Sequence, residues 1–436
     1  MQSKFNKAPA RLATCAGLAL AAALFAPAAQ ADPVKVLFVG NSYTFGRVDP
    51  VMSYNAANVH DLTAAMYAAN PAGANVFEPH PWGGVPGIFK KFTTEVGLDY
   101  DVSISARNAA SLRGQFLNTN SAGWDLRGNI GAQTWGKVVL QEQSDDPLTR
   151  RPGLASNPEY FRYYANVIEN YLHSTAPTGT IRDRDAFPGA TSALRQAACV
   201  AAGYASGRCS SDRGSFSNAN GSAGAELYLY ETWARPNLIN GAFVTTTDPT
   251  TGAVTRTGTP ATTFFNNLED MTAELKASFE AAVDQADNDG TAGFKGIARV
   301  GEAFLRAVSS GVATRDMWSP GAGADGLIDL WFDDGTHASK YGSYLSALTL
   351  FGTLTGMDPA KLGAGELAAQ ELGISSADAL ILQRVASAQL GFAAVPEPAT
   401  WALLLAGLLA CATWRRPQPR QSTIIFRQRG SPKATS

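Results

Sequence analysis

Charged residues are scarce in this chain. Asp, Glu, Lys and Arg make up 17% of its 436 residues, and the formal net charge is −2. A net charge so close to zero gives no electrostatic reason to expect nucleic acid as a partner, so we expect none. Hydrophobic residues account for 45% of the sequence, which is ample for a large packed core.

Histidine is rare as well. The four residues are His60, His80, His173 and His337. A hydrolase that uses histidine as its general base at neutral pH therefore has few choices. We single out His337, because Asp334 lies three residues before it, across a Gly-Thr turn. We interpret the other three as ordinary histidines without an acidic partner at motif spacing.

The spacing of Asp334 and His337 suits a catalytic pair. The carboxylate can reach the Nδ1 atom of the ring, fix its tautomer and favour the imidazolium that forms during nucleophilic attack. The alternative is a surface aspartate near a turn histidine.

The first glycine loop after residue 31, Gly40-Asn41-Ser42-Tyr43-Thr44, lacks three familiar motifs. It has neither the Gly-Lys-Ser/Thr of a phosphate loop nor the glycines of a G-x-G-x-x-G fingerprint. Thr44 stands where a G-x-S-x-G elbow has its second glycine. The loop directly follows a buried-strand run at 34–39, which places Ser42 at a sheet edge, near backbone N–H groups that suit an oxyanion. The alternative is a strand-to-helix turn with a capping serine.

The N-terminus carries a secretory signal. Basic residues precede an apolar run at 12–25, and Ala29-Gln30-Ala31 supplies the small residues that signal peptidase requires. We therefore expect residues 1–31 to be removed.

The C-terminus carries a second signal. Pro396-Glu397-Pro398 precedes a short, largely apolar run at 399–414 and two arginines. This order, over residues 393–418, resembles the PEP-CTERM sorting signal of Gram-negative bacteria. The resemblance implies a protein of the cell envelope or exterior, anchored transiently in the inner membrane and cut near Pro396 by an exosortase. A plain C-terminal anchor is the alternative, and the basic tail at 419–436 has no counterpart in the family signal.

Two of the four cysteines belong to these terminal segments. The remaining pair, Cys199 and Cys209, would reach an oxidising compartment, so we predict a disulfide between them. No further Cys or His lies near them at ligand spacing, which favours a structural crosslink over a metal site.

Between the two signals, residues 32–392, strand-like and helix-like patterns alternate. The strand-like runs are 34–39, 102–105, 138–140 and 227–230, and two clear helical faces span 264–282 and 341–348. Such alternation predicts a three-layer α/β/α sandwich with a mostly parallel, flavodoxin-like sheet. Polar stretches at 174–225 and 240–262 are expected to be loop insertions, and residues 361–392 a helical extension.

A serine after the first strand, followed near the end of the domain by D-x-x-H, resembles the SGNH/GDSL serine hydrolases. The resemblance spans roughly residues 33–360, with Gly40-Asn41-Ser42 in place of the usual Gly-Asp-Ser. It implies that Ser42 is the nucleophile, His337 the base and Asp334 its orienting acid, with no metal or cofactor.

The family's middle blocks supply its oxyanion hole, and here they differ from the usual pattern. A glycine N–H normally follows the second strand, whereas this chain has Ala110 within 108–112. An asparagine amide normally follows the third strand, whereas this chain has Gln143 within 139–144. The resemblance therefore implies an oxyanion hole formed by the N–H groups of Ser42 and Ala110 and the amide of Gln143.

Together these patterns predict an exported serine esterase that hydrolyses O-acyl esters. PEP-CTERM proteins tend to occur in polysaccharide-producing bacteria, so acetyl groups on an envelope or extracellular polysaccharide are the expected substrate. Signal peptidase and exosortase are the expected processing partners. The alternative is a non-catalytic envelope or matrix protein that uses the same fold to bind glycan.

Overall fold

The computed structural model describes residues 32–47, 49–69, 79–118, 124–240, 244–247, 254–257, 263–319 and 324–392. The predicted signal peptide, the sorting signal and the basic tail lie outside these residues. No helix among the described residues is both long and apolar enough to cross a membrane.

The centre of the described region is a six-stranded, all-parallel sheet with the order β2-β3-β1-β4-β5-β8. Its strands are β1 (Val34–Gly40), β2 (His60–Asp61), β3 (Tyr100–Ala106), β4 (Lys137–Gln141), β5 (Glu226–Tyr230) and β8 (Gly296–Ala298). All carboxyl ends meet at one edge, where reactive groups collect in sheets of this type. The four predicted strands lie in β1, β3, β4 and β5. The two outer strands, β2 and β8, are too short to show a periodic pattern.

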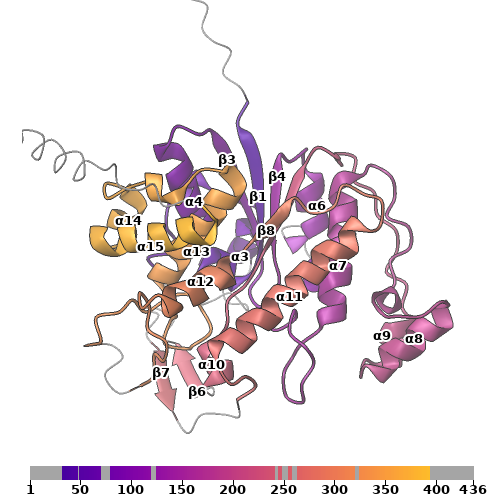
Figure 1. The fold of residues 1–436 in the computed structure, drawn as a ribbon. Coiled ribbons are helices and arrows are strands. Elements are labelled where there is room, and N and C mark those ends of the chain that lie inside the picture. Colours follow the sequence, from indigo (N-terminus) through magenta and orange to yellow (C-terminus); the bar gives the residue numbers. More distant parts are fainter. Residues whose placement is uncertain are drawn as a thin grey trace, which may run out of the picture. The chain divides into compact units, whose positions relative to one another are not determined.

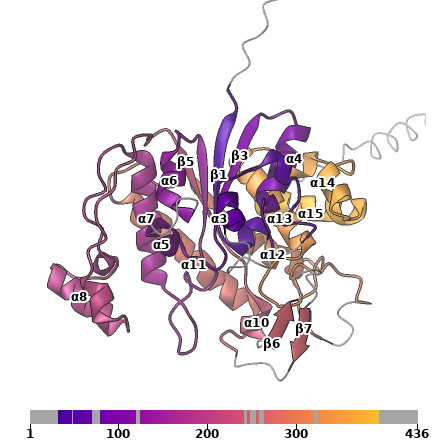
Figure 2. The ribbon, with the colours of Figure 1, turned by 180° about the vertical axis from the view of Figure 1, so that it is seen from behind.

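Helices cover both faces of the sheet (Figures 1 and 2). One layer contains α4 (Gly84–Glu95), α12 (Val300–Ser309), α13 (Lys340–Thr355), α14 (Leu367–Glu371) and α15 (Ser376–Gln389). The other contains α5 (Leu112–Phe116), α6 (Leu126–Gly131), α7 (Pro158–His173) and α11 (Leu268–Asp287). The predicted three-layer α/β/α class is therefore confirmed.

Shorter elements complete the described chain. They are α2 (Ser42–Phe45), η2 (Ala56–Asn58), α3 (Ala64–Ala69), η4 (Asp183–Ala186), α8 (Ser192–Ala201), α9 (Ser206–Ser210), α10 (Pro236–Ile239) and η6 (Pro359–Lys361).

The local sequence explains the main elements. Residues 36–39 of β1 are fully buried, as expected for a parallel strand that is covered on both faces. On one face, Phe38 meets the ring of Phe89 from α4 edge-on, with ring centroids 5.4 Å apart. Asn267 directly precedes helix α11 and caps it, because its side chain accepts the N–H of Asp270.

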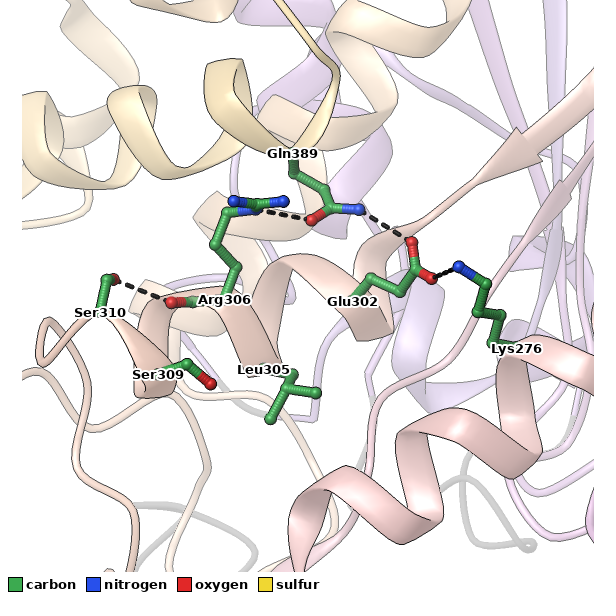
Figure 3. Close-up of a pocket in the computed structure, with 7 residues that line it drawn as sticks. All are labelled: Lys276, Glu302, Leu305, Arg306, Ser309, Ser310 and Gln389. Atoms are coloured by element: carbon green, nitrogen blue, oxygen red, sulfur yellow. Dashed lines mark hydrogen bonds and ion pairs between the residues drawn. The ribbon is translucent and has the colours of Figure 1, made fainter.

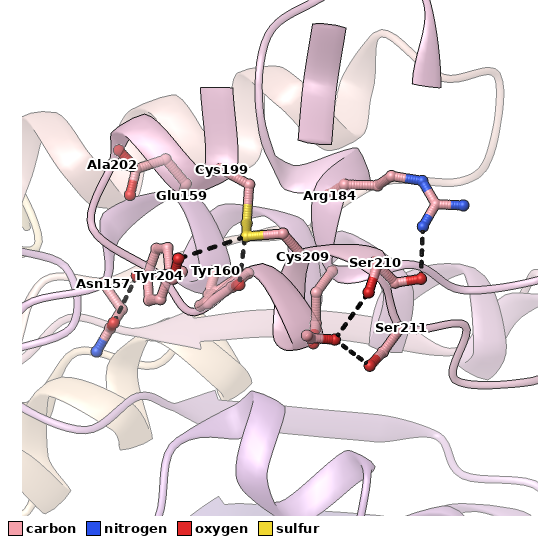
Figure 4. The surroundings of a disulfide bond; sticks show 12 residues. Asn157, Glu159, Tyr160, Arg184, Cys199, Ala202, Tyr204, Cys209, Ser210 and Ser211 are labelled. Atoms are coloured by element: carbon pink, nitrogen blue, oxygen red, sulfur yellow. Dashed lines mark hydrogen bonds between the residues drawn. A yellow bond between two sulfur atoms is a disulfide. The ribbon is translucent and has the colours of Figure 1, made fainter. Parts of the chain in front are cut away.

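The two insertions contain more regular structure than loops. Residues 174–225 include η4, α8 and α9, and a disulfide joins Cys199 to Cys209 with Cα atoms 5.8 Å apart (Figure 4). Residues 240–262 contain an antiparallel hairpin of β6 (Val244–Thr247) and β7 (Val254–Thr257), separate from the main sheet. These elements are short, from four to ten residues, so few repeats of a periodic pattern fit within them.

The C-terminal extension is tied to the domain by side chains. Gln389 at the end of α15 accepts from Arg306 (2.8 Å) and donates to Glu302 (2.9 Å), both on α12. Glu302 also pairs with Lys276 of α11 at 2.5 Å (Figure 3). These contacts line a shallow hollow of about 570 Å³ between the three helices. None of the residues predicted to be catalytic lies in it.

Candidate active site

Ser42 is the first residue of α2 and follows β1 after a single turn residue. The structure brings it to His337, which is 295 positions away in the chain. The Ser42 Oγ atom lies 2.9 Å from the His337 Nε2 atom. Among the described residues, the N–H of Ser42 has no hydrogen-bond acceptor.

Asp334 holds the other side of the imidazole ring. The His337 Nδ1 atom lies 2.6 Å from one Asp334 carboxylate oxygen. The other carboxylate oxygen accepts the N–H groups of Thr336 (2.8 Å) and His337 (2.9 Å). Burial alone would raise the pKa of Asp334, but these hydrogen bonds and the nearby imidazole outweigh it and lower that pKa. Asp334 is therefore an ionised carboxylate that orients the ring.

Aromatic side chains support this arrangement. Tyr43 stacks on Trp233 with ring centroids 4.1 Å apart and meets the His337 ring edge-on at 5.6 Å. The indole N–H of Trp233 donates to the carbonyl of Thr336 at 3.0 Å. Gly335 has φ +65°, and a Cβ at this position would lie 2.5 Å from the Trp318 ring, so the turn requires glycine. Trp233 follows the end of β5 by three residues, and this position is the sequence signal that could place it at this edge of the sheet. Trp318 has no such signal.

Asn41 connects the nucleophile loop to the loop after β3. Its side-chain oxygen accepts the N–H of Tyr43 (3.1 Å) and caps α2. Its amide nitrogen donates to the carbonyl of Ala110 (3.2 Å). Asn41 thus uses both halves of its amide, which an aspartate could not do.

The structure does not support the oxyanion role expected for Ala110. Its N–H donates to the carbonyl of Arg107 at 3.2 Å and closes a turn. Ala109 in this turn adopts φ +52°, in the left-handed region. The predicted donor is therefore already engaged, because the loop folds back on itself after β3.

Gln141, the last residue of β4, and Gln143, two residues after it, have different roles. The Gln141 side-chain oxygen accepts the N–H of Asn41 (2.9 Å) and the hydroxyl of Thr44 (3.0 Å), so this buried residue holds the nucleophile loop. The Gln143 side-chain oxygen accepts the N–H of Asp145 at 2.7 Å. The amide nitrogen of half-buried Gln143 has no hydrogen-bond acceptor in the described chain, so it is available as a donor.

Two buried carboxyl groups lie behind these loops. Glu142 accepts the N–H groups of Leu112 (2.9 Å) and Gln143 (2.6 Å). Burial and the nearby Asp146 raise the pKa of Glu142 well above its ordinary value. Burial, together with the charge of Asp145, raises the pKa of Asp146 to about 7. Neither residue was singled out from the sequence.

The remaining histidines also have acidic partners, which corrects the sequence interpretation. His80 lies 2.6 Å from Asp61. His173 lies 2.6 Å from Glu169 in the preceding turn of α7, and exposed His60 lies 3.0 Å from Asp101. The pairs of His80 with Asp61 and of His60 with Asp101 form through tertiary packing and not through a sequence motif. Within the described ranges, no group of three or more His, Cys, Asp or Glu could hold a metal ion.

Several solved structures are similar to this chain. A candidate SGNH hydrolase from Slackia heliotrinireducens is 16% identical, with 74% of this chain and 100% of that chain covered and a TM-score of 0.34. A DUF4886 family protein from Bacteroides uniformis is 13% identical, with 83% and 96% covered and a TM-score of 0.38. TesA is 11% identical, with 74% and 98% covered and a TM-score of 0.33. These values are too low to assign the chain to a family.

No curated protein matches this chain. The family model of the PEP-CTERM protein-sorting motif matches residues 394–416, as the Pro-Glu-Pro pattern predicts. The motif implies processing by an exosortase, and it indicates an exported protein of the Gram-negative cell envelope.

Proposed function

We propose that this chain is an exported serine esterase of the SGNH type that hydrolyses O-acyl esters. One observation carries the proposal: Ser42, His337 and Asp334 form a continuous hydrogen-bonded chain, with contacts of 2.9 Å and 2.6 Å. A serine hydroxyl, an imidazole and an oriented carboxylate in this order activate a nucleophile for acyl transfer.

The reaction follows from these contacts. The Nε2 atom of His337 takes the hydroxyl proton as Ser42 Oγ attacks the acyl carbonyl carbon. Asp334 stabilises the imidazolium, which then returns the proton to the departing alcohol. Water, activated by the same imidazole, releases the acid from the acyl-enzyme and regenerates Ser42.

The negative oxygen of the tetrahedral intermediate requires hydrogen-bond donors. We assign two: the N–H of Ser42 and the amide nitrogen of Gln143, neither of which has another acceptor in the described chain. Donors that are oriented in advance stabilise charge that develops only during the reaction. Acetyl groups on an envelope or extracellular polysaccharide are the substrates we propose, because the sorting motif indicates an exported envelope protein and PEP-CTERM proteins tend to occur in polysaccharide-producing bacteria.

The first prediction tests the triad with a panel of short-chain acyl esters and acetylated glycans. Ser42→Ala and His337→Ala should each remove nearly all turnover by the processed protein, and the double variant should be scarcely worse, because a triad acts as a unit. Asp334→Asn should lower kcat on the order of 10⁴-fold, because the imidazole loses its orienting carboxylate.

The neighbouring exposed acid, Asp333, supplies a matched control. Asp333→Asn should leave kcat unchanged. Substantial ester hydrolysis by the Ser42→Ala variant would refute the triad. If glycans bind but no ester is cleaved by the native protein, the chain is instead a glycan-binding protein.

A further inference from the structure

The backbone of Arg107 lies beside the loop that carries the proposed nucleophile. Arg107 is the first residue after β3, and its N–H donates to the carbonyl of Gly40 at 3.1 Å. Adjacent strands are about 4.8 Å apart, so the backbone of Arg107 runs directly alongside the loop that ends in Ser42. The turn that Arg107 begins is also held against this loop by the bond from Asn41 to Ala110.

The side chain of Arg107 rests on an aromatic ring. Its guanidinium carbon lies 4.7 Å from the centroid of the Trp124 ring. A guanidinium stacked in this way is restrained, while the N–H groups along its edge stay open to an acceptor. Arg107 is half-buried, which strengthens any charged contact that it makes relative to one in open water.

Among the described residues, Arg107 has no acidic partner, unlike Arg113 and Arg235. Arg113 pairs with Asp183 at 2.7 Å, and buried Arg235 pairs with Asp145. Within the described chain, Arg107 has no carboxylate within ion-pair distance and makes no hydrogen bond through its guanidinium.

We propose that Arg107, braced by Trp124, binds a carboxylate on the substrate, so that the preferred esters are O-acylated acidic sugars. This inference rests on the proposed esterase function, because it places the acid group of the alcohol next to Ser42. A planar guanidinium matches a carboxylate with two parallel hydrogen bonds, which gives orientation as well as attraction. The acyl group then faces the nucleophile while the uronate is held at the end of β3.

The test compares mono-O-acetylated glucuronic acid with its methyl ester, using the processed protein. The methyl ester lacks the negative charge and carries a second ester bond, so the release of acetate is measured for both probes. The native protein should show a kcat/KM about tenfold to a hundredfold higher for the acid, the range expected for a charge-assisted pair. Arg107→Gln should abolish this preference by lowering kcat/KM for the acid to about the value for the methyl ester, because the charge contact is lost. Arg107→Lys should retain part of the preference for the acid, since lysine keeps the positive charge but cannot donate two parallel hydrogen bonds.

Arg384 provides a control for net charge, because it is an exposed arginine on α15. Arg384→Gln should keep the full preference for the acid. Equal hydrolysis of both probes by the native protein would overturn the inference and leave the proposed esterase intact.

A binding measurement separates the inference from the esterase proposal. Calorimetric titration with glucuronate, with glucose as the comparison, should show binding of the acid that Arg107→Gln removes. If neither ester is cleaved, the esterase proposal fails. In that case, glucuronate binding that depends on Arg107 still supports the carboxylate site, and its absence rejects the site.

Discussion

At the scale of single residues, Asn41 uses both halves of its side-chain amide. An aspartate here, as in the Gly-Asp-Ser pattern that this loop resembles, would face the Ala110 carbonyl without a proton to donate. The second prediction is that Asn41→Asp, which restores the usual motif, lowers the free energy of unfolding by about 1–3 kcal/mol. It should also lower kcat, because the loop carrying Ser42 loses its tie to the neighbouring loop.

Urea unfolding and steady-state kinetics measure the two effects. Asn41→Ala is the comparison, because it removes the bond without adding a charge and should be less harmful than the aspartate. An Asn41→Asp variant with unchanged stability and kcat would show that the bond to Ala110 does not position the nucleophile.

The third prediction separates Gln143 from Gln141. Gln143→Ala should lower kcat on the order of 10²–10³-fold with little change in KM, because its amide contacts an oxygen that is fully charged only in the tetrahedral intermediate. Gln141→Ala should mainly lower stability, since it leaves the buried N–H of Asn41 and the hydroxyl of Thr44 without their acceptor. Steady-state kinetics and urea unfolding of both variants test this; the reverse pattern would move the oxyanion contact to Gln141.

At the scale of elements, the disulfide stabilises a peripheral helix pair. In α8, Cys199 is the only buried residue, so this helix has little core of its own. The two cysteines are ten positions apart, and closing a loop of this size contributes about 2–3 kcal/mol on the chain-entropy model. The crosslink therefore replaces the hydrophobic contacts that α8 and α9 lack.

The fourth prediction is that loss of this crosslink has a local effect. The Cys199→Ala, Cys209→Ala double variant should become sensitive to proteolysis within residues 192–210. Ester hydrolysis should be unchanged, because the two sulfur atoms contact Tyr160 and Tyr204 and not the proposed triad. Native protein should yield alkylatable thiols at these positions only after reduction. Free thiols at both positions in native protein would contradict the disulfide, and lost activity in the double variant would contradict its local role.

At the scale of the whole molecule, the buried acids give the fold a pH dependence. The pKa of Asp146 is raised to about 7, whereas the unfolded carboxyl ionises near pH 4. Between these values the unfolded state releases its proton first, so the free energy of unfolding falls as the pH rises through this window. The raised pKa of Glu142 acts in the same direction.

The fifth prediction follows from this fall in the free energy of unfolding as the pH rises. Asp146→Asn keeps an acceptor for the side chain of Asn157, which donates to Asp146 at 2.7 Å, but it cannot ionise. Its free energy of unfolding should therefore fall less between pH 5 and pH 8 than that of the native protein, by on the order of a few kcal/mol. Urea unfolding at both pH values measures this. Equal pH dependence in the two proteins would show that Asp146 does not carry the effect.

The sequence by itself determined the features that depend on near neighbours. Strand-like and helix-like periodicities predicted the layered fold, and the short spacing of Asp334 and His337 predicted the pair that the structure forms. The Pro-Glu-Pro pattern likewise identified the sorting motif. Each of these patterns involves residues that are close together in the sequence, so it can be recognised without knowing how distant segments pack.

Only the tertiary structure decided which distant residues meet. The order of strands places Asn41 beside Ala110 and Arg107 beside the nucleophile loop. The fold of the whole domain brings Ser42 to His337. It also shows that the Ala110 N–H is already bonded within a turn, which no motif could reveal. Hydrogen-bond partners and burial depend on how the layers pack around the sheet, and that packing is a property of the whole chain rather than of any segment.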